Sequence, residues 1–211
     1  MATAVAHALD LARFQATPLV REPYEYLIVP QFLRADALAA INADYPKIDR
    51  PGSFPSDTLA YGPAFAAFLD ELTGPESTRA FSEKFGLDLA RYPTTVTVRG
   101  MCQKKDGRIH TDTKSKIITV LVYMNPAWEE QGGRLRVLRA ADDLDDYAAE
   151  VPPVEGTLLA FRRSDTSFHG HKPFVGPRRV VQLNWVTDET NARFETARHR
   201  VSAFFKRVRA A

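Results

Sequence analysis

The sequence has a single cysteine, Cys102, among its 211 residues. An intramolecular disulfide is therefore impossible, and a structural zinc site made of cysteines is excluded as well. Long apolar runs are also missing, so no segment approaches the roughly 20 residues that a membrane-spanning helix needs. The first residues lack a basic leader and are a poor secretory signal peptide. Together these absences predict a cytoplasmic protein without a membrane span.

The chain also lacks a large excess of either positive or negative charge. The chain has 28 basic and 26 acidic side chains, which leaves a formal net charge of +2. This balance gives no electrostatic reason to expect nucleic acid as a partner. Hydrophobic residues make up 45% and charged residues 26%, as in ordinary globular proteins. At this length we expect one domain that spans residues 1–211.

The first part of the chain, residues 1–93, is expected to support a core that follows it. The apolar spacing predicts helices at 2–16, 35–45, 64–72 and 76–85, and Gly86 is expected to end the last of them. A strand is predicted at 24–32 from its β-forming residues. Residues 46–62 contain three prolines and two glycines, which predicts an irregular loop.

The second part is rich in β-branched residues. Strands are predicted at 94–99, 117–124, 134–138, 157–161 and 180–186, with an acidic helix at 142–150. Turns rather than crossover helices separate these strands, which favours antiparallel pairing. With a C-terminal helix at 187–211, the pattern predicts an α+β fold. Its core is a double-stranded β-helix, or jelly roll, over residues 94–186, and helices flank it.

A candidate metal site begins with the stretch from Arg108 to Asp112, directly after a turn. In an extended strand, His110 and Asp112 would point to the same face. A third, distant histidine would complete the 2-His-1-carboxylate facial triad that holds Fe(II) and leaves coordination positions open. For the tripeptide alone, a simple hydrogen-bonded pair of His110 and Asp112 is the more frequent explanation.

Two histidines compete for the third ligand position. His169 directly follows Ser167 and Phe168 at the end of a strand-like segment. His171 lies closer to Pro173 and is expected at the rim of the site or as its support. We therefore predict His110, Asp112 and His169 as the metal ligands, with His171 as the alternative to His169.

An adjacent arginine pair suggests a second ligand of the metal. A dicarboxylate that chelates the metal at one end needs a cation at the other, and arginine binds a carboxylate through two hydrogen bonds. Arg178 would share a polar strand face with Val180, Gln182 and Asn184. Arg179 would share a packing face with Val181, Leu183 and Trp185. Arg178 is therefore preferred as the residue that binds the dicarboxylate. Arg179 is the alternative, one residue further along the strand, and would otherwise be a solvated charge at a strand end.

Four segments together resemble the Fe(II)/2-oxoglutarate-dependent dioxygenase superfamily, in its prolyl-4-hydroxylase-like branch. They are HTD at 110–112, GGRLRVL at 132–138, GTLLAF at 156–161 and SFHGHKPFVGPRR at 167–179. The resemblance covers the chain from about Thr94 to Val186. It implies that His110, Asp112 and His169 bind Fe(II), and that Arg178 binds the distal carboxylate of 2-oxoglutarate. Tyr123 would either supplement that arginine or pack in the core.

The activity that the resemblance implies is oxidative decarboxylation of 2-oxoglutarate to succinate and CO2, coupled to hydroxylation of a substrate. A non-catalytic metal- or sugar-binding jelly roll is the alternative, although it would not need a second carboxylate-binding residue such as Arg178. A cupin-type isomerase would typically use more histidines. No motif indicates the substrate, so a protein side chain, an amino acid, a sugar and a lipid all remain open.

Overall fold

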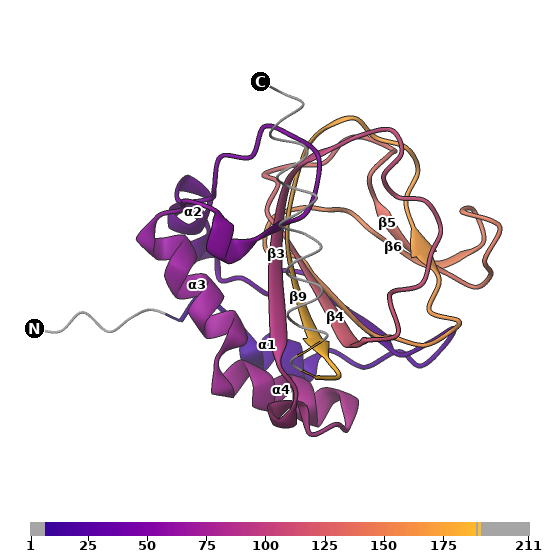
Figure 1. Ribbon diagram of the computed structural model, residues 1–211, viewed down its shortest axis with the longest axis horizontal. Helices are drawn as coiled ribbons and strands as arrows, with labels where there is room; N and C mark the ends of the chain where they lie inside the picture. Colours follow the sequence, from indigo (N-terminus) through magenta and orange to yellow (C-terminus); the bar gives the residue numbers. More distant parts are fainter. Residues whose placement is uncertain (1–6, 189, 191–211) are drawn as a thin grey trace, which may run out of the picture.

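Two antiparallel sheets form the centre of the computed structural model, which describes residues 7–188 and residue 190 (Figure 1). The larger sheet has the strand order β1-β7-β4-β9-β3-β2 and the smaller sheet has the order β6-β5-β8. The large sheet contains β1 Tyr26–Val29, β2 Phe54–Pro55, β3 Thr94–Cys102, β4 Lys116–Tyr123, β7 Leu158–Arg162 and β9 Gly176–Val186. The small sheet contains β5 Leu135–Leu138, β6 Tyr147–Val151 and β8 His169–Gly170. The helix predicted at 187–211 lies outside the described residues except for residues 187, 188 and 190.

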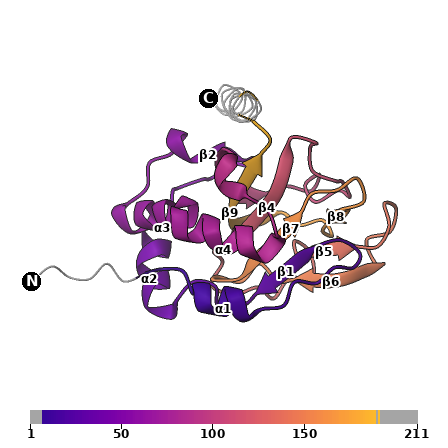
Figure 2. The same cartoon turned by 90° about the horizontal axis from the view of Figure 1, so that it is seen from below.

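The helices lie on one side of the large sheet and the small sheet lies on the other (Figures 1 and 2). The α-helices are α1 Leu11–Ala16, α2 Ala35–Ala43, α3 Pro63–Thr73 and α4 Pro75–Phe85, and two short 3-10 helices span Ser56–Thr58 and Leu89–Arg91. Within this part of the chain, no helix is both long and apolar enough to cross a membrane.

Alternation along the central strands divides their side chains between two cores. On β9, Val181, Leu183 and Trp185 pack into the cluster that faces the helices, where Phe81 of α4 lies 5.2 Å from the Trp185 ring. Truncating an aromatic residue in such a cluster typically costs about 3–5 kcal/mol of unfolding free energy. The opposite faces of β4 and β9 look toward the small sheet and surround the space between the two sheets. This arrangement is the double-stranded β-helix core that the sequence predicts.

The N-terminal predictions are confirmed except at the first helix. Residues 2–6 of the helix predicted at 2–16 lie outside the described part of the chain, and residues 7–10 are not helical. Helix α1 begins at Leu11, and Asp10 caps it by accepting a hydrogen bond from the Arg13 amide at 2.8 Å. Leu9 instead forms an isolated bridge with Leu33. Gly86 ends α4 with a left-handed φ of 63°, as expected. The predicted loop at 46–62 is irregular except for β2, which pairs with β3, and one 3-10 turn.

The predicted acidic helix at 142–150 is wrong, because residues 142–146 are irregular and residues 147–150 belong to β6, paired antiparallel with β5. Arg136 of β5 forms ion pairs with Asp145 and Glu150, each at 2.6 Å. Arg139 adds a third pair, with Asp146 at 3.0 Å. Three of the acidic residues are thus matched by arginines in β5 or directly after it, and this pairing together with the β5–β6 ladder outweighs a weak helical preference.

Candidate metal centre and its pocket

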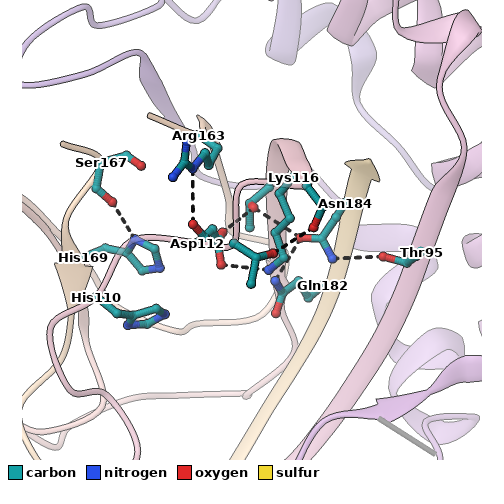
Figure 3. A network of polar contacts seen from close by, with 12 residues as sticks. Thr95, His110, Asp112, Lys116, Arg163, Ser167, His169, Gln182 and Asn184 are labelled. Carbon is teal, nitrogen blue, oxygen red and sulfur yellow. Dashed lines mark hydrogen bonds and ion pairs between the residues drawn. The ribbon is translucent and has the colours of Figure 1, made fainter. Parts of the chain in front are cut away.

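His110, Asp112 and His169 come together at one point between the sheets. Each offers a ligand atom, and the three atoms lie within 4.8 Å of one another. The extended strand assumed for His110 and Asp112 is not formed, because within residues 108–112 only His110 pairs with another segment. It forms an isolated bridge with His169, in which each residue donates its backbone N–H to the carbonyl of the other, at 3.1 and 3.0 Å. This bridge, rather than strand alternation, places the two rings side by side (Figure 3).

Both imidazoles present the same nitrogen to the site. The Nδ1 atom of His169 lies 3.0 Å from the Ser167 carbonyl, and Nδ1 of His110 lies 2.8 Å from the Arg108 carbonyl. Because a carbonyl oxygen can only accept, Nδ1 carries the proton in each ring and Nε2 keeps a free lone pair. Burial lowers the pKa of His169 to about 4. His169 is therefore neutral at physiological pH, which is the form that binds metals.

Asp112 is an ionised carboxylate with both oxygens held. Its Oδ1 forms an ion pair with Lys116 Nζ at 2.8 Å, and its Oδ2 accepts a hydrogen bond from the Thr119 hydroxyl at 2.6 Å. Burial raises the pKa of Asp112, but the charge of Lys116, the charge that His169 gains at low pH and the two hydrogen bonds outweigh burial and hold that pKa at about 2. Arg163 fixes the backbone by donating to the Asp112 carbonyl at 3.2 Å.

Behind Asp112, a row of polar side chains crosses three strands of the large sheet (Figure 3). Thr119 of β4 faces Asn184 of β9, which in turn faces Thr95 of β3. The Asn184 amide donates to the Thr95 hydroxyl at 3.2 Å, and Gln182 donates to the Asn184 oxygen at 3.0 Å. The orientation of the carboxylate is therefore set by side chains on the inner face of the sheet.

Replacing Thr119 with valine is expected to weaken metal binding by roughly tenfold, since outer-shell partners of metal ligands typically contribute 10- to 100-fold to affinity. The valine keeps the shape but removes the hydrogen bond to Asp112. Titration with Mn(II) measures the effect. Thr94→Val is the matched control, because Thr94 lies on the face of β3 that points away from the pocket. This variant should bind Mn(II) like the wild type. Equal affinities of the two variants would contradict a positioning role for Thr119.

A pocket of about 430 Å³ connects this centre to the inner face of β9. Its walls include Arg178, Val180, Gln182 and Asn184, the alternate residues that the sequence places on one face. Arg179 is on the other face, half-buried, with its guanidinium 5.2 Å from the centre of the Tyr45 ring. The assignment of the two arginines to opposite faces is thus confirmed, whereas their roles stay predictions.

Arg178 is buried and carries an unused hydrogen-bond donor. Its Nε donates to the Gly133 carbonyl at 2.8 Å, but among the described residues its buried Nη2 has no partner. The guanidinium lies 5.4 Å from the centre of the Tyr123 ring, whose buried hydroxyl also lacks a partner in this part of the chain. An unsatisfied buried polar group typically costs about 1–3 kcal/mol, and a carboxylate at Arg178 would remove that cost. Tyr123 does not itself line the pocket.

His171 is buried like His169 but lies outside the group of three. Its backbone N–H donates to the Gly107 carbonyl at 2.8 Å, and its ring packs against Gly107 so closely that a Cβ there would collide with it. Gly107 has a φ of 82°, which also favours glycine. His171 therefore supports the turn at the mouth of the pocket, the secondary role that the sequence suggests for it.

The metal-free protein is expected to lose stability as the pH falls from 7 to 5. Burial lowers the pKa of both His169 and His171 to about 4, from an ordinary value of 6.5. Below pH 6.5 the unfolded chain therefore takes up protons that the folded chain refuses, and each histidine costs about 2 kcal/mol by pH 5. Asp112, with a lowered pKa, acts only below pH 4. Urea unfolding at several pH values tests this expectation, and His171→Gln should make the dependence shallower. A free energy of unfolding that stays constant from pH 7 to 5 would contradict it.

Sequence reasoning missed the residues that hold Asp112. Lys116 looks like one more cation of a solvated loop, and Arg163 carries no motif. Thr119 was the one available indication, because it is the polar residue within the apolar run at 117–124.

Comparison with known proteins identifies the same part of the chain. Residues 97–187 match the family model of the 2OG-Fe(II) oxygenase superfamily. A prolyl-4-hydroxylase from Pseudomonas putida superposes with a TM-score of 0.55 at 19% identity, covering 76% of this chain and 91% of that one. A 2OG-Fe(II) oxygenase family oxidoreductase from Burkholderia pseudomallei gives 0.51 at 17%, covering 83% and 88%.

HygX from Streptomyces hygroscopicus, a structure with nickel and 2-oxoglutarate bound, gives a TM-score of 0.50 at 12% identity, covering 76% of this chain and 81% of that one. No curated protein sequence matches the chain significantly. The donor set found here, two imidazoles and an ionised carboxylate beside a buried arginine, fits the iron and the dicarboxylate that this superfamily uses. Residues 97–187 thus resemble the 2OG-Fe(II) oxygenase superfamily, whose cofactor is Fe(II) and whose co-substrate is 2-oxoglutarate, and the chain shares its fold with prolyl 4-hydroxylases.

Proposed function

We propose that this protein is an Fe(II)- and 2-oxoglutarate-dependent dioxygenase that hydroxylates a substrate and releases succinate and CO2. One observation carries the proposal. The same pocket contains three ligand atoms within 4.8 Å of one another and a buried arginine with an unused donor. A site that only bound a metal would have no use for that arginine, whereas a chelating dicarboxylate requires it.

In this proposal, His110 and His169 bind the metal through Nε2 and Asp112 binds it through a carboxylate oxygen. Three protein ligands on one side leave the other coordination positions open. When bound, Fe(II) and 2-oxoglutarate supply the oxidative chemistry that no side chain can perform. Arg178 orients the co-substrate through its distal carboxylate. Tyr123 is the proposed second partner of that carboxylate, and Arg179 remains the alternative to Arg178.

The remaining side chains keep the site ready. Lys116 and Thr119 keep Asp112 charged and oriented, at 2.8 and 2.6 Å. Leu121, Leu135 and Phe161 line the pocket with apolar surface and limit the access of water. His110 is the exposed member of the three ligands, so the substrate reaches the centre from its side.

We also infer that residues 1–93 support the core within a single domain. Phe81 packs on Trp185, and the Tyr45 hydroxyl donates to the Arg99 carbonyl of β3 at 2.6 Å. The helices thus cover the face of the large sheet that would otherwise expose its apolar side chains.

Anaerobic titration with Fe(II) and 2-oxoglutarate tests the function directly. The chelate is expected to produce a metal-to-ligand charge-transfer band, and admission of air should then yield succinate slowly even without substrate. If no band develops, the oxygenase function is contradicted. A band without any succinate in air would instead favour the alternative, a non-catalytic metal-binding jelly roll.

A further inference from the structure

The pocket carries more positive charge than the whole protein. Its walls include five basic side chains and two acidic ones, a formal charge of +3, whereas the entire chain has +2. The basic residues are Arg99, Lys105, Arg108, Lys116 and Arg178, and the acidic ones are Asp106 and Asp112. A cleft lined by one sign of charge between low-dielectric walls concentrates the electric field and attracts ligands of the opposite sign.

Binding of the metal and the co-substrate does not neutralise this positive charge. The two positive charges of Fe(II) offset the two negative charges of 2-oxoglutarate, so the loaded pocket remains at +3. Arg178 is assigned to the co-substrate, and Lys116 is paired with Asp112 at 2.8 Å. Three cations of the pocket, Arg99, Lys105 and Arg108, then have only Asp106 to balance them.

Arg99 brings one of these cations into the pocket. It is on the inner face of β3, opposite Val180, so it approaches from the side of β9 that is away from β4 and Tyr123. Only 27% of its side chain is exposed. Its contacts are long, with Nη2 3.8 Å from Asp106 and Nε 3.4 Å from the Gly52 carbonyl. Burial lowers the pKa of Arg99, yet a guanidinium stays charged at neutral pH. A partly desolvated and weakly paired cation of this kind gains from an anionic ligand.

Lys105 and Arg108 are exposed at the mouth of the pocket, on a turn that two hydrogen bonds hold in place. Asp106 accepts from the Gln103 amide at 3.1 Å, and the Gly107 carbonyl accepts from the His171 amide at 2.8 Å. Among the residues that the structure describes, neither Lys105 nor Arg108 forms an ion pair. The turn therefore presents two positive charges that can attract an anion to the pocket that contains His110.

We infer that the substrate of the proposed oxygenase is a small acidic compound whose carboxylate or phosphate group binds Arg99. Lys105 and Arg108 attract this group to the mouth of the pocket. The inference rests on the proposed function and narrows its substrate class. The compound is small because the same 430 Å³ also has to accommodate 2-oxoglutarate.

Calorimetry with inorganic phosphate and with acetate tests this inference on the full chain loaded with Mn(II) and 2-oxoglutarate. At least one anion is expected to bind with a Kd in the millimolar range or below. Binding of phosphate alone would indicate a phosphate group, binding of acetate alone a carboxylate, and binding of both the shared anionic chemistry. Failure of both anions to bind would overturn the inference.

Variants locate the bound anion. Arg99→Gln should weaken binding at least tenfold, and Arg99→Lys, which keeps the charge, should stay within a few-fold of the wild type. The double variant Lys105→Gln/Arg108→Gln should bind less tightly and show a weaker dependence on salt. Arg91→Gln, an exposed arginine outside the pocket, is the control and should match the wild type. Unchanged binding in Arg99→Gln would overturn the inference.

The charge-transfer band separates this inference from the proposed function. If the wild type shows no band, the proposed function has failed. A normal band without anion binding contradicts the substrate class alone. If the wild type shows the band and folded Arg99→Gln does not, Arg99 belongs to the 2-oxoglutarate site, and the inference is overturned. Thermal melting shows whether each variant is folded.

Discussion

Replacing His169 with alanine is expected to abolish tight metal binding and to reduce succinate formation to background. The variant removes an Nε2 lone pair from a group of three ligand atoms that lie within 4.8 Å of one another. The loss should exceed the 10- to 100-fold that outer-shell changes typically cause, because a ligand itself is removed. Titration with Mn(II) measures affinity without depending on turnover, and succinate analysis measures the consequence.

His171→Ala is an unusually close control for His169→Ala. The two histidines are each 5% exposed, and burial lowers the pKa of both to about 4. They differ in position, because the His171 ring packs against Gly107 rather than beside His110. We expect His171→Ala to lower stability while Mn(II) affinity stays within a few-fold of the wild type. The opposite pattern, with metal binding lost in His171→Ala and kept in His169→Ala, would show that the ligand assignment is wrong.

Arg178→Gln is expected to weaken the binding of 2-oxoglutarate by between 30-fold and a few thousandfold. Truncating one partner of a buried charge pair typically costs about 2–5 kcal/mol, and about 1.4 kcal/mol corresponds to a factor of ten. Glutamine keeps some polarity but leaves the distal carboxylate without a cation. Titration of the charge-transfer band with 2-oxoglutarate gives the affinity, while Mn(II) binding in the absence of co-substrate should be unchanged.

Arg179→Gln is the matched comparison, because it removes the same charge one residue further along β9. Arg179 points to the other face of the sheet and lies over the Tyr45 ring, so the affinity for 2-oxoglutarate should change by less than about threefold. Tyr123→Phe should have an intermediate effect, since it removes a single hydroxyl near Arg178. If Arg179→Gln abolishes the band and Arg178→Gln does not, the proposed register of the co-substrate site is wrong by one residue.

Strand alternation accounts for the positions of these two arginines, whereas it does not explain how the two histidines meet. On β9, the alternation of polar and apolar residues assigns Arg178 and Arg179 to opposite faces, because side chains in a regular strand alternate regardless of what they contact. The same rule was applied to His110 and Asp112, which do reach the same site, but not from a strand. That segment is irregular, and a backbone bridge to His169 positions it.

The acidic segment at 142–150 is a second case in which a local sequence pattern led to a wrong prediction. Its composition suggested a helix, but Arg136 of a neighbouring strand pairs with Asp145 and Glu150. Likewise, nothing local to Asp112 indicates that the inner face of the sheet holds its carboxylate through Thr119. Contacts between residues far apart in the chain decide such details, and a single sequence does not state them.

The sequence by itself was enough to predict the chemistry that we propose for this protein. Its residue types and short-range periodicity were sufficient to indicate two histidines, a carboxylate and an arginine around an iron and a dicarboxylate, on a β-rich core. The tertiary structure decided which side chains surround that chemistry. It brought Arg99, Lys105 and Arg108 to the pocket that contains Arg178, and so revealed a local charge of +3 that the nearly neutral composition conceals. The electrostatic potential of a pocket depends on which charges are close in space, not on which are close in the sequence. Only the folded structure therefore shows where positive charge is concentrated.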